Sequence, residues 1–159
     1  MLPKEFIQQV LVEEIKDVID SRHPLLALVL IGTGIEYLGR CLDTAREWDA
    51  DYKGVKLKPF DRAITELFPQ TYHDKEVRKR LQHFYSPTKG LQLAEAANVK
   101  DAIDRSNHPH RTKSGNVTLV VEYVYDDFVD ACHEVIKRSF PVTDKMSKLF
   151  IDTSMPVSQ

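Results

Sequence analysis

Apolar residues recur at intervals of three and four along most of the chain, and this helical period constrains the fold more than any other feature. Residues 3–20 place apolar side chains on one face and Pro3 in the first turn, which predicts an amphipathic helix. Residues 24–47 are apolar nearly all round at first and amphipathic after Ile31, so we expect the central helix of the core here. The same period predicts three further helices, over residues 59–69, 74–85 and 123–139.

The helical period is interrupted at residues 91–93 and 117–121. "SGN" before "VTLVVEY" is typical of a tight turn that leads into a strand. We expect a hairpin or two-stranded ribbon in which "LQL" or "HRTK" pairs with "VTLVV". The predicted fold is therefore all-α, a four- or five-helix bundle with a small β-ribbon inserted before the last helix. A sheet of four or more strands would contradict it.

A chain of 159 residues with 42% hydrophobic content is most simply one domain spanning residues 1–159. A domain of this size buries roughly two-thirds of its unfolded surface, so its core needs no metal or disulfide. Cys41 and Cys132 fall at apolar helical positions, which favours reduced core residues in a cytoplasmic protein. The longest apolar run, Leu25 to Ile31, is short for a bilayer span, and we expect no membrane partner.

The central helix carries the stretch "IGTGIEYLG". Its glycines lack the spacing of a dinucleotide fingerprint and the Gly-Lys-Ser/Thr of a P-loop. We therefore assign them to close helix–helix approach. Glu36 lies on the same apolar helix, where an unpaired buried carboxylate is costly. We expect Glu36 to be buried and paired with Arg78 or Arg40.

Positive charge concentrates in residues 75–113, which hold nine Lys and Arg against four acids, in a chain whose net charge is −2. The densest part is the helix predicted over residues 74–85. At about 100° per residue, Val77, Leu81 and Phe84 share its core face. Such a local excess of positive charge permits an anion site on an otherwise acidic protein.

The polar side of this helix supports two interpretations. Lys79, Arg80 and His83 are neighbours at spacings of three and four, whereas Arg78 lies about 140° away from His83. An exposed charged face is the ordinary outcome for such residues. The alternative is anion binding, in which arginine presents a planar fork to phosphate and histidine moves a proton near neutral pH.

The stretch "RKRLQH", from Arg78 to His83, together with the order of helices, resembles the HEPN superfamily of small helical proteins, including uncharacterised bacterial members. The resemblance implies a metal-independent endoribonuclease in which Arg78 and His83 are catalytic, with no cofactor and no metal. It also implies a homodimer, because one histidine per chain supplies both a base and an acid only when two copies meet. RNA or a nucleotide is then the ligand, and we assign Lys79, Arg80 and Tyr85 to substrate binding.

One residue departs from the pattern of that superfamily. Many catalytic members carry Asn, Asp or His directly after the arginine, whereas this chain has Lys79. The departure favours the alternative hypothesis, a non-catalytic helical interaction domain whose partner the sequence does not name.

Two other groups of residues have weaker patterns. His108 and His110 flank a proline, but no third ligand for a metal stands nearby in the sequence. The acids of "YDDFVD", from Tyr125 to Asp130, are expected in the first turn of the last helix, where acids complement the helix dipole. Neither group predicts a site.

Overall fold

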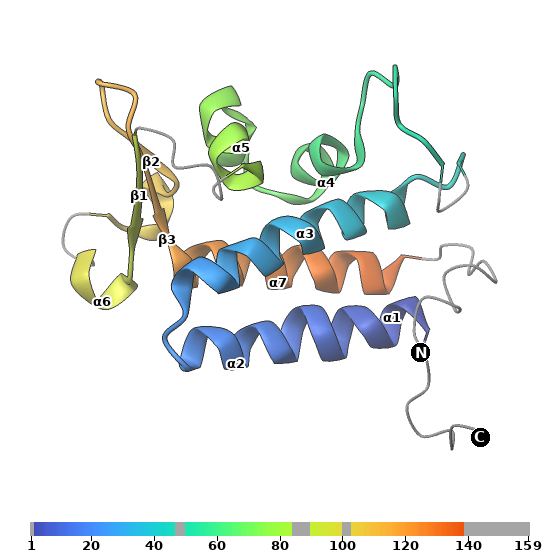
Figure 1. Ribbon diagram of the computed structural model, residues 1–159, viewed down its shortest axis with the longest axis horizontal. Coiled ribbons are helices and arrows are strands. Elements are labelled where there is room, and N and C mark those ends of the chain that lie inside the picture. The colour runs from blue at the N-terminus through green and yellow to red at the C-terminus, as the bar shows by residue number, and fades with distance from the viewer. Residues whose placement is uncertain (1, 47–49, 84–89, 100–102, 139–159) are drawn as a thin grey trace, which may run out of the picture.

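The computed structural model describes residues 2–46, 50–83, 90–99 and 103–138. Three long helices pack together at its centre (Figure 1). The first is continuous from residue 3 to residue 20 and comprises α1 (Pro3–Phe6), a π-helical segment η1 (Ile7–Glu14) and α2 (Ile15–Asp20). The other two are α3 (Pro24–Leu42) and α7 (Val121–Lys137). The helix-dominated fold predicted from the period is confirmed.

Two shorter helices cover the side of α3 that faces away from α2 (Figure 1). They are α4 (Pro59–Leu67) and α5 (Lys75–Gln82), joined by a 3₁₀ turn, η2 (Gln70–His73). At Gly39, a Cβ atom would overlap the backbone of Pro59 at the start of α4. At Gly34, a Cβ atom would overlap the ring of Phe128 from α7, so Gly34 and Gly39 serve close helix approach, as predicted.

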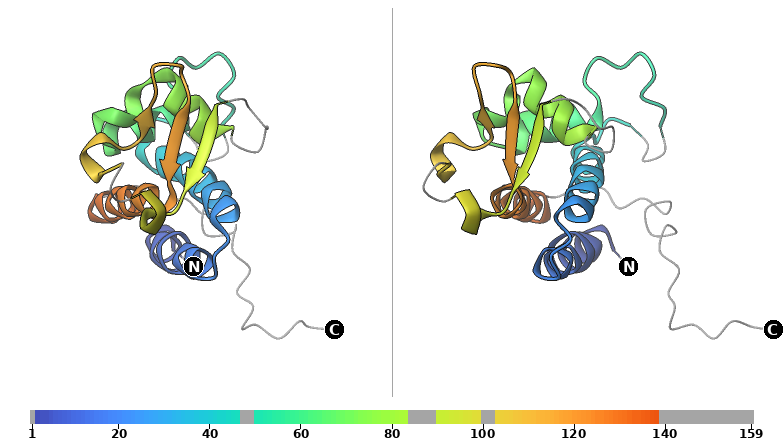
Figure 2. Two further views of the ribbon diagram at one scale, coloured as in Figure 1. Left: turned by 90° about the vertical axis from the view of Figure 1, so that its left-hand side faces the viewer. Right: turned by 60° about the vertical axis from the view of Figure 1, so that its left-hand side comes forward.

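A small sheet lies at one end of the helices (Figure 2). Its strands are β1 (Leu91–Ala94), β2 (His110–Arg111) and β3 (Val117–Val120), in the order β1-β3-β2. β1 runs parallel to β3, and β2 runs antiparallel to it. The prediction of a two-stranded ribbon is thus wrong by one strand, because both candidate segments pair with β3, one on each side.

Two short turns lie in the connection between β1 and β2. They are α6 (Ala96–Val99) and η3 (Arg105–Asn107). A parallel pair cannot be joined by a tight hairpin and needs a long crossover. The chain between β1 and β3 provides that crossover and places β2 on the far side of β3.

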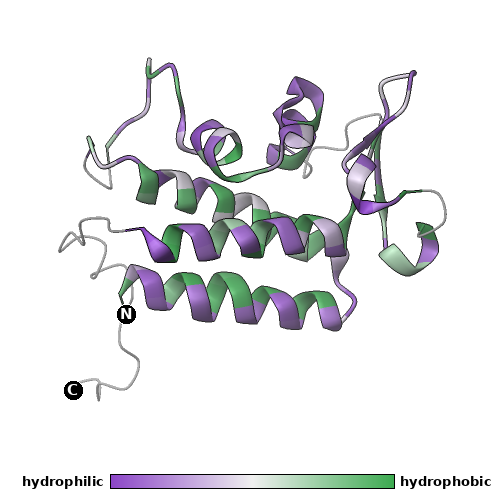
Figure 3. Ribbon diagram, turned by 180° about the vertical axis from the view of Figure 1, so that it is seen from behind, coloured by the Kyte–Doolittle hydropathy of each residue, from purple (hydrophilic) through white to green (hydrophobic). Residues whose placement is uncertain are grey.

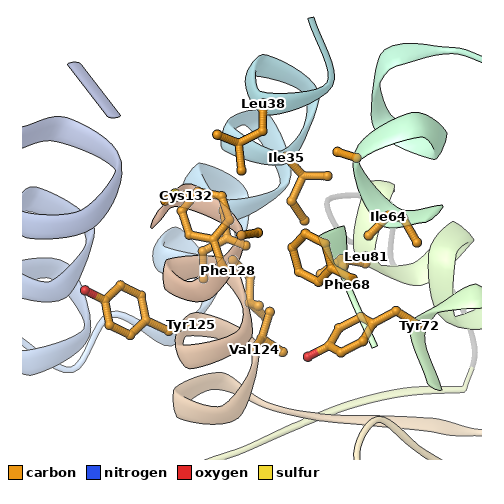
Figure 4. Close-up of a cluster of buried hydrophobic side chains, with 14 of the residues drawn as sticks. Ile35, Leu38, Ile64, Phe68, Tyr72, Leu81, Val124, Tyr125, Phe128 and Cys132 are labelled. Atoms are coloured by element: carbon orange, nitrogen blue, oxygen red, sulfur yellow. The ribbon is translucent and has the colours of Figure 1, made fainter. Parts of the chain in front are cut away.

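The core lies where α3, α4, α5 and α7 meet (Figure 4). Ile35 and Phe128 are fully buried at its centre, and Tyr72 contributes a buried ring from η2. Tyr125 points from α7 toward the first helix, and its hydroxyl donates to the Val12 carbonyl at 2.7 Å. Cys41 and Cys132 are buried and unbridged, which confirms their assignment as reduced core residues.

Helix boundaries differ from the expectations mainly at the ends. α3 stops at Leu42 rather than residue 47, and α7 begins at Val121 rather than residue 123. Figure 3 shows mixed hydropathy along the first helix and α7, and a largely hydrophilic α5. That pattern matches helices that bury one face each.

α3 is long and apolar enough to pass a test for a membrane-spanning helix by length and composition. It passes because the uncharged residues Gly32, Thr33 and Gly34 follow the apolar run of Leu25 to Ile31, and the rest of the helix contains only two charged residues, Glu36 and Arg40. Core helices of globular proteins pass the same test, and α3 packs against α4 and α7 here. This property alone is weak evidence for a membrane span.

Candidate functional site at the end of helix α5

The helix that carries the motif is fixed at its start by Asp74. One carboxylate oxygen of Asp74 accepts hydrogen bonds from the N–H groups of Glu76 at 2.9 Å and Val77 at 3.2 Å. The other oxygen accepts from Arg111 of β2 at 2.7 Å. Partial burial acts to raise the pKa of Asp74, but these hydrogen bonds and the arginine outweigh burial and lower it. The cap therefore ties α5 to the sheet.

The buried face of α5 is the predicted one. Val77 and Leu81 are 1% and 0% exposed and pack into the core. Lys79 is exposed, as expected of the outer face, and Phe84 lies outside the described residues.

Arg78 makes a structural contact within its own chain. Its guanidinium donates to Asp61 of α4 at 3.1 Å, and both side chains are about one-third exposed. The Nε atom of Arg78 is buried and has no hydrogen-bond partner among the described residues. This pair joins α5 to α4, so the arginine of the motif is engaged by a carboxylate of the fold.

The other basic residues of the motif differ in their burial and in their neighbours. Arg80 is largely buried and lies 3.7 Å from Glu76 of the preceding turn, and its guanidinium lies near Gly90, the residue before β1. Tyr85, the predicted aromatic contact to substrate, lies outside the described residues. Arg80 therefore does not share an exposed face with Lys79 and His83, which are both exposed.

His83 stands at the C-terminal end of α5 and is exposed. It lines a cavity of about 260 Å³ between α3, α4 and α5. Glu36 of α3, Phe60 of α4 and Gln82 of α5 line the same cavity. The structure thus brings His83 together with Glu36, while Arg78 binds Asp61 on α4.

The expectation that Glu36 is buried is wrong. Its side chain is 51% exposed, and it lies 3.5 Å from Arg40 one turn along α3. The pairing with Arg40 is confirmed and the alternative pairing with Arg78 is not found. The reason for the error is the uneven burial of α3, whose outward face between the first helix and α4 is left open.

A second, larger cavity of about 580 Å³ adjoins the first. The two share Glu36, Phe60 and Gln82 as lining residues, so one wall belongs to both. The larger cavity adds three cations, Arg40, Lys53 and Lys58. Sequence reasoning missed the two lysines because "DADYKGVKLKP" has the composition of an ordinary polar loop, although three lysines within six residues were a visible signal.

A buried carboxylate holds the loop that forms this cavity. The side chain of Asp43 is 2% exposed. It accepts hydrogen bonds from Arg46 at 2.9 Å and from the Tyr52 hydroxyl at 3.0 Å, and Arg62 lies 3.9 Å away. Burial acts to raise the pKa of Asp43, but its partners outweigh burial and lower it. The loop is thereby anchored to α3 and α4.

The guanidinium of Arg40 also lies over the ring of Tyr52, at 5.1 Å from its centroid. Arg46 lies over the same ring at 5.8 Å. Cation–π contacts of this kind attract the charged groups to the face of the ring and so help to fix their orientation. Arg40 is therefore positioned from two directions, by Glu36 and by Tyr52.

The other candidate residues have structural partners. His108 is buried, and its Nε2 atom accepts a hydrogen bond from the Val120 N–H at 3.0 Å. Asp126 and Asp127 lie in the second turn of α7, not the first, and both bind Arg105. No cluster of three or more His, Cys, Asp or Glu side chains that could hold a metal occurs among the described residues.

Comparison with family models, with curated proteins and with solved structures found no match for this chain.

Proposed function

We propose that this protein binds RNA or a nucleotide in the two adjoining cavities beside His83. The observation that carries the proposal is the set of lining residues that the two cavities share, because it places an imidazole in one cavity next to three cations in the other. Lysine and arginine bind phosphate through charge-assisted hydrogen bonds, and histidine exchanges a proton near neutral pH. A ligand with phosphate groups can interact with the cations and with the histidine.

The engagement of Arg78 with Asp61 favours binding over cleavage. A transition-state contact needs a donor that is aimed at the reacting phosphate. The guanidinium of Arg78 is instead directed at a carboxylate of its own chain at 3.1 Å. Together with Lys79 in the position after the arginine, this contact supports a non-cleaving member of a HEPN-like fold.

Metal-independent cleavage by a homodimer is the second candidate, and one observation favours it. Leu25, Leu26 and Val29 are exposed on α3 by 54%, 48% and 37%. Val29 also lines the cavity of His83. A second copy packed on this apolar face would bring two copies of His83 near each other and supply both a base and an acid.

Binding is tested with a fluorescein-labelled single-stranded RNA by fluorescence anisotropy in EDTA. We expect saturable binding that weakens as salt is raised, because phosphate contacts release counterions. His83→Ala should weaken binding several-fold. Lys16→Gln on α2 is the control, because Lys16 is exposed far from the cavities and pairs with Asp20. Equal affinities of the wild-type and His83→Ala proteins would contradict the proposal.

The same samples separate binding from cleavage. After incubation in EDTA, intact RNA is expected for a binding protein. A product that ends in a 2′,3′-cyclic phosphate, lost in His83→Ala, would establish the second candidate instead. Light scattering and the cleavage assay, each run on the wild type and on Val29→Asp, then show whether the activity requires a dimer formed through α3.

A further inference from the structure

The larger cavity has the size of a small-molecule site. Its volume of about 580 Å³ lies within the range of about 300 to 1,000 Å³ that is typical of ligand pockets. Its lining combines two buried apolar residues, Pro59 and Phe60, with charged side chains. Both parts of an amphipathic ligand find a partner here.

The charges of this cavity favour an anion. Arg40, Lys53 and Lys58 face two carboxylates, Glu36 and Asp51. Glu36 lies beside Arg40, and one oxygen of Asp51 accepts the backbone N–H of Lys53 at 2.8 Å. Among the described residues, no carboxylate forms an ion pair with the ammonium group of Lys53 or of Lys58.

The wall that carries these cations is preorganised. Asp43 anchors Tyr52 through a 3.0 Å hydrogen bond, and Tyr52 in turn supports Arg40 through its ring. The entropy cost of ordering this loop on ligand binding is therefore lower than it would be for a loop without these internal contacts. Arg40 is therefore held in place before the ligand arrives.

The polar part of the lining suits the edge of a planar base. Phe60 is 2% exposed, so it closes the cavity on the side of the core but offers almost no surface on which a ring could stack. Gln82, on the wall shared with the His83 cavity, carries an amide that both donates and accepts hydrogen bonds. Side-chain amides of this kind recognise the edges of nucleobases.

We infer that the larger cavity holds one nucleotide unit, with its phosphate at Arg40, Lys53 and Lys58 and the edge of its base at Gln82. This inference rests on the proposed binding of RNA or a nucleotide and assigns a separate subsite to it. The shared wall directs the next phosphate of a strand toward His83. A free mononucleotide should therefore occupy the same subsite alone.

The test uses isothermal titration calorimetry with adenosine 5′-monophosphate, adenosine and inorganic phosphate as probes. Lys53→Gln combined with Lys58→Gln should lower the affinity for the monophosphate by at least about tenfold, the equivalent of one charge-assisted contact. Lys56→Gln is the matched control, because Lys56 is exposed in the same loop but does not line the cavity. Adenosine and inorganic phosphate should each bind more weakly than the monophosphate.

The outcomes separate the subsite from the proposed function. RNA binding that depends on His83 but not on Lys53 and Lys58 would overturn the subsite and leave the proposed function standing. Monophosphate binding that depends on both lysines, without any binding of RNA, would support the subsite and overturn RNA as the ligand. If neither RNA nor the monophosphate binds, or if phosphate and the monophosphate bind equally well, the subsite is overturned.

Discussion

The buried imidazole of His108 should make the stability of this protein fall as the pH is lowered. His108 is 2% exposed, and its Nε2 atom accepts the Val120 N–H. The proton of the neutral ring is therefore on Nδ1, which is buried without a hydrogen-bond partner among the described residues. Burial, assisted by the charge of Arg105, lowers the pKa of His108 to about 4.

The size of the effect follows from the difference in proton binding between the two states. The unfolded chain protonates this residue near pH 6.5, whereas the folded chain keeps it neutral down to about pH 4. Between these values the unfolded state binds more protons, so stability is present above pH 6.5 and is lost as the pH falls toward 4. From pH 7 to pH 5 the expected loss from this residue is about 2 kcal/mol.

The assay is urea unfolding at pH 7 and pH 5 for the wild type and for His108→Gln, whose side-chain oxygen can accept the same N–H. The wild type should lose about 2 kcal/mol more than the variant over this interval. Acids whose pKa values are shifted, such as Asp74 and Asp127, are present in both proteins and cancel in the comparison. His110→Gln, at a half-buried position in β2, serves as the control. Equal losses in the wild type and His108→Gln would refute the reasoning.

Two further substitutions test the packing of the long helices. Gly39→Ala should destabilise the fold by several kcal/mol despite the better helix propensity of alanine, because its Cβ would overlap the Pro59 backbone, and thermal unfolding measures the loss. Tyr125→Phe should cost about 1 kcal/mol in urea unfolding, because it removes the hydrogen bond to the Val12 carbonyl, and an unchanged unfolding midpoint would show that water replaces the hydroxyl.

The helices could be predicted because each one buries a single face. Val77 and Leu81 illustrate this, since their spacing of four placed both in the core before any contact was known. The ends of the helices were harder to predict because they depend on side-chain partners. α3 stops at Leu42 because Asp43 turns its carboxylate toward Arg46 and Tyr52, and a partner nine residues away leaves no local pattern.

The sheet could be predicted only in part. The β-branched run of β3 and the turn before it indicated a strand, and that strand is fully buried. The parallel register of Leu91 opposite Val117 joins segments that are separated by the whole crossover. No short-range signal encodes such a pairing, since it depends on where the intervening turns return the chain.

The candidate site shows the same division between local and distant information. The spacing within α5 indicated that Arg78 and His83 point in different directions, and the structure gives them different neighbours, Asp61 for one and Glu36 for the other. The cations that accompany His83 come instead from α3 and from a loop that precedes α4. Since Asp43 holds that loop in place, the charge around the cavities depends on a residue that no motif contains. In the proposed site, the basic motif of α5 contributes His83, and the loop from residue 50 to residue 58 contributes Lys53 and Lys58.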